Sequence, residues 1–255
     1  MLTSSNYADN DKLNIGGQNG IGSKACNIFS KKFSVETVDA KKKKIYRQTW
    51  SNNMLDKTDP IIEKYTKYPY TKITFTPDYE KFGLNGLTID IAELFRKRVY
   101  DLCALTDAKI KVYLNDELLA IKGFEKYVDL YNTGEEKPAF DSNEKWNIGA
   151  MFSENGFQHM SFVNGICTQK GGKHVEYVTN SITKKLSELI SKRRKASVKP
   201  VHIRDNLFVF VNAKSVDDAT FDSQTKDTLT TPSSKFGSKW TPDPKLIEKL
   251  YKTKI

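Results

Sequence analysis

The first part of the chain alternates apolar and polar residues in the manner of paired strands. Alternation runs from Phe33 to Thr37 and again from Ile45 to Thr49, and the charged run Lys41 to Lys44 separates the two segments. This pattern predicts an antiparallel hairpin whose lysines lie in a solvated turn. A further strand is expected from Lys72 to Thr76, ended by Pro77.

Elsewhere apolar residues recur at steps of three and four, which is the spacing of an amphipathic helix. Such segments run from Ala25 to Phe29, from Thr88 to Leu102, from Lys173 to Lys192 and from Asp243 to Tyr251. Thr88 is the expected N-cap of the second segment. The residues at these steps are Ile91, Leu94, Phe95, Arg98, Val99 and Leu102.

Short strands are expected between these helices. They are Lys109 to Leu114 before an Asn115-Asp116 turn, Met151 to Phe152, Met160 to Val163, and the dense apolar run Leu207 to Val211, which is typical of a central strand. Residues 219–239 are predicted to be a loop. Strands interleaved with helices in both halves indicate a mixed α/β (α+β) fold.

Composition narrows the class of protein. The 255 residues include 41 Lys and Arg against 31 Asp and Glu, a net charge of +10 that suits a polyanionic partner or simply a soluble basic protein. No apolar run could cross a bilayer and no secretory signal precedes the first segment, so we expect neither membrane insertion nor secretion. The scattered Cys26, Cys103 and Cys167 indicate reduced thiols in an intracellular compartment, and no metal site held mainly by this chain is expected.

Three segments have residues suited to phosphate contacts. Gly17-x-Asn19-Gly20-x-Gly22-x-Lys24 opens a predicted helix, where glycine amides, the helix dipole and Lys24 could bind a phosphate. The loop Phe221 to Lys226 offers Gln224, Thr225 and Lys226. The cluster Lys192-Arg193-Arg194-Lys195 ends a helix and could contact a nucleic-acid backbone. Taken singly, the two loops are more typical of ordinary solvated loops, and the basic cluster is equally consistent with a solvated helix end.

Together these segments resemble a known family. Leu2 to Tyr7, Gly16 to Lys24 and Cys26 to Ser30 resemble the ATP lid of eukaryotic or viral-type type II DNA topoisomerases. The motifs Ser161-Phe162-Val163-Asn164-Gly165, Lys170-Gly171-Gly172-Lys173-His174-Val175 and Phe221-Asp222-Ser223-Gln224-Thr225-Lys226 resemble the transducer and the QTK loop of that family. Similar order and spacing extend over essentially the whole chain.

The resemblance implies a fold and a division into domains. Residues 1–122 would form the C-terminal part of a GHKL-type ATPase sandwich that includes the ATP lid. Residues 123–255 would form a transducer like domain 2 of ribosomal protein S5. In this family, ATP binding and hydrolysis close an N-terminal gate between two subunits and drive one DNA duplex through another.

The resemblance also implies roles for individual residues. The residues expected to contact ATP are Ser4, Ser5, Asn6, Gly17, Gln18, Asn19, Gly20, Ile21, Gly22, Ser23, Lys24, Gln224, Thr225 and Lys226. The transducer residues Gln224 and Lys226 would reach the γ-phosphate, and Lys192, Arg193, Arg194 and Lys195 would contact DNA. Gln18 stands where many relatives carry Arg, which removes one charge from the loop.

Other parts of the family pattern have no match in this sequence. The general-base Glu, the Mg²⁺-binding Asn and the adenine-reading Asp precede the lid in the family, and the DNA-cleaving Tyr lies far downstream. We therefore expect a segment of an ATP-dependent type II topoisomerase that uses ATP and Mg²⁺, binds double-stranded DNA, and forms a homodimer within its parent protein. The segment alone is expected to hydrolyse ATP poorly and to act in the nucleus or in a viral or host intracellular compartment.

Two alternatives remain. One is a non-catalytic, basic nucleic-acid-binding module derived from a GHKL protein, which would bind DNA in a salt-dependent way without responding to nucleotide. The other is a different GHKL protein, such as a MutL mismatch-repair protein or a ninety-kilodalton heat-shock chaperone. The QTK hexapeptide and the run from Lys170 to Val175 favour the topoisomerases over this last class.

Overall fold

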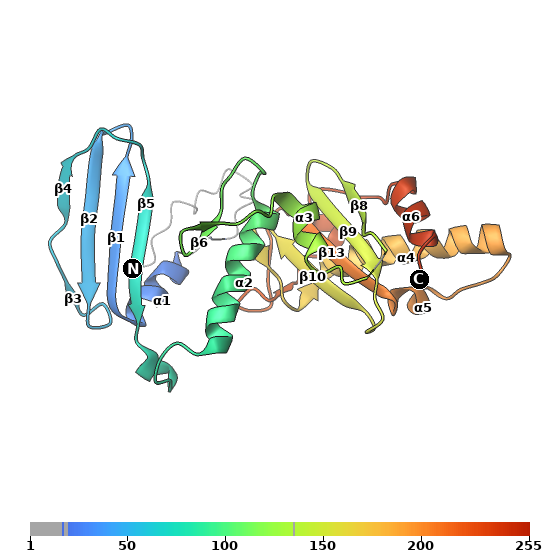
Figure 1. Cartoon of the computed structure of the whole chain (residues 1–255), viewed down its shortest axis with the longest axis horizontal. Coiled ribbons are helices and arrows are strands. Elements are labelled where there is room, and N and C mark those ends of the chain that lie inside the picture. Colours follow the sequence, from blue (N-terminus) through green and yellow to red (C-terminus); the bar gives the residue numbers. More distant parts are fainter. Residues whose placement is uncertain (1–16, 18–19, 135) are drawn as a thin grey trace. The chain divides into compact units, whose positions relative to one another are not determined.

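The chain forms two compact units. The computed structural model describes residues 17, 20–134 and 136–255 (Figure 1). Among these, residues 17–93 form the first unit and residues 94–255 the second. The expected domain boundary at 122/123 lies within the second unit and stays a prediction about the family's domains.

The first unit is an antiparallel sheet with one short helix packed against it. Its elements are α1 (Ile21–Ile28), β1 (Ser30–Asp39), β2 (Lys44–Ser51), β3 (Asp56–Lys57), β4 (Ile61–Lys64), β5 (Thr71–Pro77) and the 3-10 helix η1 (Tyr79–Phe82). The strand order is β3-β2-β1-β5, with β4 also paired to β2. The expected hairpin is confirmed: β1 and β2 are antiparallel, with Val35 opposite Gln48.

Hydrogen bonds attach the end of α1 to this sheet. The Ser30 hydroxyl donates to the Cys26 carbonyl at 2.6 Å, and the Asp78 amide donates to the Phe29 carbonyl at 2.8 Å. The Asn53 side-chain amide donates to the Ile28 carbonyl and to the Asp78 carboxylate, both at 3.0 Å. The position of α1, which follows the glycine loop, is therefore set by backbone and amide contacts at its C-terminal end.

The second unit is a mixed sheet between helices. The helix α2 (Ile89–Leu105) leads into it. Its remaining elements are β6 (Tyr113–Leu114), β7 (Glu117–Leu118), α3 (Gly123–Asp129), β8 (Ala139–Ser142), β9 (Trp146–Phe152), β10 (Gln158–Val163), β11 (Ile166–Cys167), β12 (Gly171–Gly172), α4 (Lys173–Arg194), α5 (Pro200–Arg204), β13 (Leu207–Ala213), β14 (Thr228–Leu229), η2 (Ser233–Lys235) and α6 (Pro244–Tyr251).

The strand β13 is central, as its dense apolar sequence predicts. The sheet order is β11-β10-β13-β9-β8, and β13 runs parallel to β10 and antiparallel to β9. Leu207, Val209 and Val211 lie in the core shared with α4 and α6. Phe210, on the other face, lies in the core shared with α3, and Phe208 packs against that core. Helices cover both faces, so β13 is buried on each side.

The helix α4 buries the face that its spacing predicts. Val175, Val178, Ile182 and Leu186 are buried against the sheet. The helix α6 begins at the expected position, where the Asp243 carboxylate accepts a hydrogen bond from the Lys245 amide at 2.7 Å. These two helices pack together over the same face of the sheet (Figure 1).

The expected helix is present as α2, but the apolar residues at steps of three and four do not form its buried face. Leu94, Phe95 and Leu102 are exposed, whereas Asp101 and Cys103 are buried. The reason is a polar network that makes burial of a carboxylate favourable at a position where the spacing alone predicts a solvated residue.

The structure also differs from the sequence prediction at residues 109–114 and 219–239. The expected strand from 109 to 114 is only the short β6, although the turn at Asn115 and Asp116 is present, with φ of 50° and 66°. The expected loop at 219–239 contains β14 and η2, and it buries Leu229 and Phe236 completely. Because these two buried residues do not belong to a periodic hydrophobic pattern, the sequence does not predict that they are buried.

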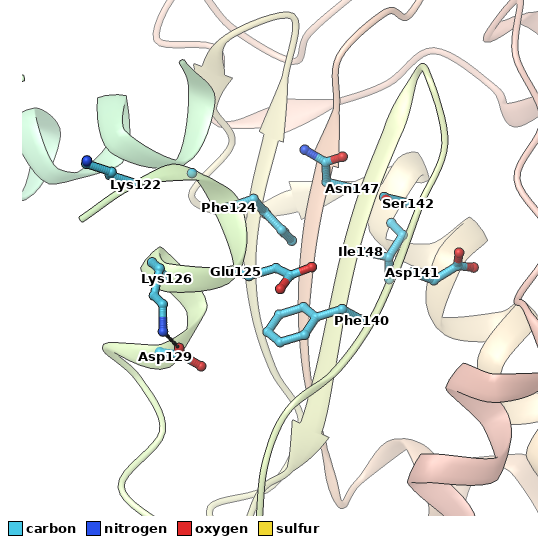
Figure 2. Close-up of a pocket in the computed structure, with 11 residues that line it drawn as sticks. Lys122, Phe124, Glu125, Lys126, Asp129, Phe140, Asp141, Ser142, Asn147 and Ile148 are labelled. Carbon is cyan, nitrogen blue, oxygen red and sulfur yellow. Dashed lines mark hydrogen bonds and ion pairs between the residues drawn. The ribbon is translucent and has the colours of Figure 1, made fainter. Parts of the chain in front are cut away.

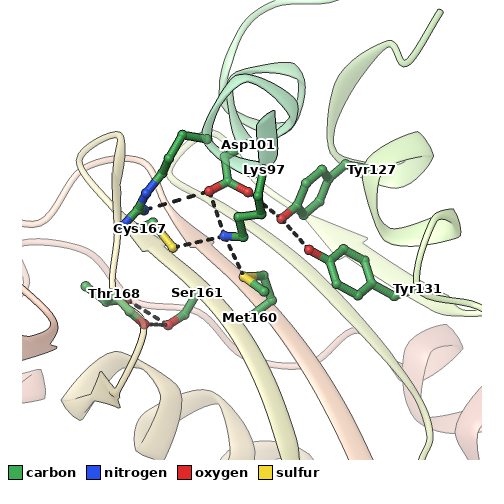
Figure 3. Close-up of polar contacts among 9 residues, drawn as sticks. Lys97, Asp101, Tyr127, Tyr131, Met160, Ser161, Cys167 and Thr168 are labelled. Carbon is green, nitrogen blue, oxygen red and sulfur yellow. Dashed lines mark hydrogen bonds and ion pairs between the residues drawn. The ribbon is translucent and has the colours of Figure 1, made fainter. Parts of the chain in front are cut away.

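The buried network joins α2 to α3 and to the sheet (Figure 3). Lys97 Nζ lies 2.7 Å from one Asp101 carboxylate oxygen, and the Tyr127 hydroxyl donates to the other at 2.7 Å. Burial raises the pKa of Tyr127, which keeps its hydroxyl protonated and able to donate. Lys97 Nζ also lies 3.5 Å from Cys167 Sγ and 3.6 Å from Met160 Sδ. Removing one partner of such a pair would leave a buried charge uncompensated, so the network holds α2 against β10 and β11.

The buried His174 predicts a stability that falls in acid. Burial, with a smaller contribution from His159, lowers the pKa of His174 from 6.5 to about 3. Below about pH 6.5 the unfolded chain therefore binds a proton that the folded chain refuses, and the free energy of unfolding should fall towards pH 3 by up to about 1.4 kcal/mol per pH unit. His174→Gln keeps a group able to reach Thr168, whose hydroxyl lies 3.1 Å from His174 Nε2.

Urea unfolding at several pH values measures this dependence. The His174→Gln curve should be flatter between pH 6 and pH 4, whereas the effect of His159 is common to both proteins and cancels. Parallel curves for the two proteins would show that His174 does not titrate as its burial requires.

Candidate functional site

The described part of the glycine loop leads directly into α1. Gly20 has φ of 64° and is the N-cap of the helix, with no side chain capping it. The amides of the first turn, Ile21 to Ser23, therefore have no side-chain acceptor from the cap and lie at the positive end of the helix dipole. The expected contacts Ser4, Ser5, Asn6, Gln18 and Asn19 lie outside the described residues.

Lys24 follows in the first turns of α1. Its Nζ atom is buried, and within the described part of the chain it has no hydrogen-bond partner. An unpaired buried ammonium is costly in a folded protein because its lost hydration is not replaced. An anionic ligand at this position would remove that cost.

The segment that contains Gln224 to Lys226 is held at its base by backbone pairing. β12 and β14 are parallel, and the amide of Lys170 donates to the Asp227 carbonyl at 3.0 Å. Gly172 has φ of 126°, and a Cβ atom there would lie 2.3 Å from the Leu229 carbonyl oxygen. Only glycine fits at this crossing.

Within the segment a turn contains the three residues that the sequence predicts to contact ATP. The Lys226 amide donates to the Ser223 carbonyl at 3.1 Å, and Lys226 has φ of 61°. The Gln224 side chain is exposed, while the Lys226 ammonium lies over the Phe221 ring, 5.9 Å from its centroid. Hydrogen bonds from Thr228 lower the pKa of Asp222, so this carboxylate stays charged beside the turn. The structure therefore places Gln224, Thr225 and Lys226 on one hydrogen-bonded turn.

The basic cluster at the end of α4 divides into two pairs. Arg193 forms a bidentate ion pair with Glu248 of α6, and the guanidinium groups of Arg193 and Arg194 lie 5.1 and 5.3 Å from the Tyr251 ring. Lys192 and Lys195 are exposed, and Lys195 ends the helix with φ of 52°.

The sequence gives only a weak indication that Arg193 and Arg194 contact α6. Glu248 and Tyr251 are three residues apart and therefore share one face of α6. The sequence gives no information about which helix this face meets. Of the four cations expected to contact DNA, Arg193 and Arg194 contact α6, whereas Lys192 and Lys195 are exposed.

The described residues contain neither a cluster of metal-binding side chains nor a membrane-spanning helix. Nowhere in residues 20–134 and 136–255 do three or more His, Cys, Asp or Glu side chains gather in a way that could hold a metal ion. The same residues include no helix that is both long and apolar enough to cross a membrane.

The sequence and the fold are similar to those of known proteins. Residues 113–254, more than half of the chain, match the family DNA gyrase B. The chain is 44% identical to a probable DNA topoisomerase 2 of Dictyostelium discoideum and 43% identical to DNA topoisomerase 2 of Acanthamoeba polyphaga mimivirus. All of this chain is matched in both comparisons, but it spans only 17% and 21% of the length of these two relatives.

Solved structures agree with these matches. The ATPase region of Saccharomyces cerevisiae topoisomerase II superimposes with a TM-score of 0.92 at 42% identity, over 100% of this chain and 66% of that one. The ATPase and transducer domains of topoisomerase II from Balamuthia mandrillaris give a TM-score of 0.89 at 38% identity, over 98% of this chain and 65% of that one. The mixed α/β fold predicted from the sequence is thereby confirmed as that of a topoisomerase II ATPase region.

Proposed function

Because the chain belongs to the type II DNA topoisomerase family, we propose that it works within an ATP-dependent topoisomerase, where it binds the phosphates of ATP and couples ATP hydrolysis to closure of the N-terminal gate and to DNA strand passage. The general base and the cleavage tyrosine of the family have no assigned counterpart here. The part proposed for this chain is therefore phosphate binding and coupling rather than bond cleavage.

The buried and unpartnered Lys24 ammonium is the observation that carries this proposal. A phosphate oxygen beside Nζ would supply the missing hydrogen bond and the opposite charge, and the amides of Ile21 to Ser23 would supply further donors. The residues from Ile21 to Lys24 thus fit the phosphates of a nucleoside triphosphate. Mg²⁺, which such a nucleotide carries, would be held by residues other than those described.

The turn at Gln224 to Lys226 would distinguish bound ATP from bound ADP. By resemblance to the family, Gln224 and Lys226 contact the γ-phosphate, which ATP has and ADP lacks. The backbone pairing of β12 with β14 keeps the turn in place, so little ordering entropy is lost when these side chains bind. Loss of the γ-phosphate would remove their partner and release this segment.

The basic end of α4 supports a proposal of DNA contact. Lys192 and Lys195 are exposed cations at the end of a long helix, which suits contact with backbone phosphates and not the reading of bases. We further propose that the parent protein forms a homodimer. It would act on DNA in the nucleus, or in a viral or host intracellular compartment.

Replacing Lys24 separates its role in binding from its role in folding. In Lys24→Met the buried unpaired charge is gone, so the free energy of unfolding without nucleotide should rise by about 1 kcal/mol or more. Affinity for ATP should fall about 10- to 100-fold, because the variant lacks one charge-assisted hydrogen bond of roughly 1.5–3 kcal/mol. Amide chemical shifts of residues 20–24 during an ATP titration measure the affinity, and they also detect the weak binding expected of this chain alone.

The matched control for that experiment is Lys41→Met, in the exposed turn between β1 and β2. It should change neither quantity. If the wild-type shifts do not respond to ATP, or if Lys24→Met binds ATP as well as the wild type, the nucleotide assignment fails. Persistent DNA binding with no response to ATP would then favour the non-catalytic nucleic-acid-binding module.

The two pairs in the basic cluster should behave differently towards DNA. Lys192→Ala with Lys195→Ala should weaken duplex binding, lower the log–log salt slope by about 0.9 for each phosphate that is no longer neutralised, and leave stability within about ±0.5 kcal/mol. Arg193→Ala with Arg194→Ala should also destabilise the fold by about 1 kcal/mol, since this variant has neither the ion pair with Glu248 nor the packing on Tyr251.

Fluorescence anisotropy of a labelled duplex at several salt concentrations tests the cluster, with thermal unfolding run in parallel. Sequence preference should not change in either double variant. A variant lacking all four cations that kept both its affinity and its salt slope would place the DNA site elsewhere.

A further inference from the structure

The strand β8 leaves one edge of the second sheet open. Among the described strands it is the last in the order β11-β10-β13-β9-β8 and pairs only with β9. The Asn143 amide donates to the Trp146 carbonyl at 2.8 Å. Because hydrogen-bonded and non-hydrogen-bonded pairs alternate in an antiparallel ladder, the backbone groups of Phe140 and Ser142 point away from β9. Each presents an N–H and a C=O at the open edge.

A pocket of about 360 Å³ lies beside this edge (Figure 2). It is lined by the described residues Phe124, Glu125, Phe140, Asp141, Asn147 and Ile148, among others from α3, β8 and β9. Phe140 packs on the same side of the sheet as α3. A residue added opposite Phe140 would place its side chain on that side as well, over the pocket.

The charged side chains around the pocket differ in whether they have an ion-pair or hydrogen-bond partner. Lys126 is paired with Asp129 at 3.3 Å, and the Asp141 carboxylate accepts hydrogen bonds from the Trp240 indole and the Asp243 amide, both at 3.0 Å. Glu125 has no ion pair or hydrogen bond within the described residues, and its carboxylate points into the space between Phe124 and Phe140. Lys122 points away from these residues in Figure 2.

We propose that the edge of β8 and the adjoining pocket bind an extended peptide segment whose Arg or Lys side chain enters the pocket and pairs with Glu125. Backbone pairing at Phe140 and Ser142 would add a strand to the sheet. The aliphatic stem of the basic side chain would lie on the Phe124 and Phe140 rings, with its charged head at the Glu125 carboxylate. This interaction is separate from the nucleotide and DNA contacts and does not depend on them.

A short capped peptide of alternating Val and Thr with one central Arg is a suitable probe, and the same peptide with Glu in place of Arg is its control. Chemical shifts of the wild-type chain should change at the Phe140 and Ser142 amides, and the Arg peptide should bind about five-fold or more tightly than the Glu peptide. Glu125→Gln should abolish this preference while keeping backbone pairing.

Ser142→Pro removes an outward N–H, which an edge strand tolerates, and should abolish binding, whereas Ser142→Ala should retain it. If Ser142→Pro does not fold, an Arg peptide with a methylated central backbone nitrogen gives the same test on the wild-type chain. Equal binding of the Arg and Glu peptides, or shifts confined to other regions, would overturn the proposal. A concentration-dependent dimer of the chain that Ser142→Pro abolishes would assign the edge to a second copy and would also overturn it.

Discussion

The close approach of Gly172 to Leu229 is the contact on which the start of α4 and the turn with Gln224 to Lys226 depend. With φ of 126° at Gly172 and the Leu229 carbonyl oxygen 2.3 Å from where a Cβ would lie, no other residue can occupy this position without displacing β14. α4 begins at the next residue, and the turn with Gln224 to Lys226 immediately precedes β14. One backbone crossing therefore fixes both the start of the long helix that covers the sheet and the loop proposed to contact the γ-phosphate.

This arrangement does not depend on the Gln224 side chain. The QTK turn is held by amides and carbonyls, so Gln224 remains exposed and available to a ligand. Lys24 shows the opposite arrangement, since its ammonium is buried without a hydrogen-bond partner among the described residues. At the end of α4 both situations occur side by side: Arg193 and Arg194 tie α4 to α6, while Lys192 and Lys195 remain in solvent.

Much of the fold could be predicted because its elements have a clear period. The β1–β2 hairpin, the central β13 and the buried face of α4 all follow from alternation or from steps of three and four. The face of α2 could not be predicted, because Asp101 is buried by partners from segments that lie far away in the sequence, such as Tyr127. Hydropathy gives no indication of such a compensated charge.

The candidate site could be predicted only in part. The glycine loop and the QTK turn came from a family resemblance, since composition and spacing left each of them consistent with an ordinary loop. The pairing of Arg193 with Glu248 joins residues that are 55 positions apart, and the local sequence of either helix contains no sign of the other. The open edge of β8 likewise became visible only once the strand order was known.

The most direct test of this account is amide hydrogen exchange in Gly172→Ala, with Gly165→Ala as the control. Gly165 also has a positive φ, of 79°, but a Cβ there would meet open space. In the wild type the amides of Asp222 and Lys170 should exchange slowly, because they donate to Thr228 and Asp227. Gly172→Ala should abolish that protection while β13 keeps its own, and Gly165→Ala should leave both intact. Protection that survives in Gly172→Ala, or that is missing in the wild type, would show that the glycine crossing does not hold the turn with Gln224 to Lys226.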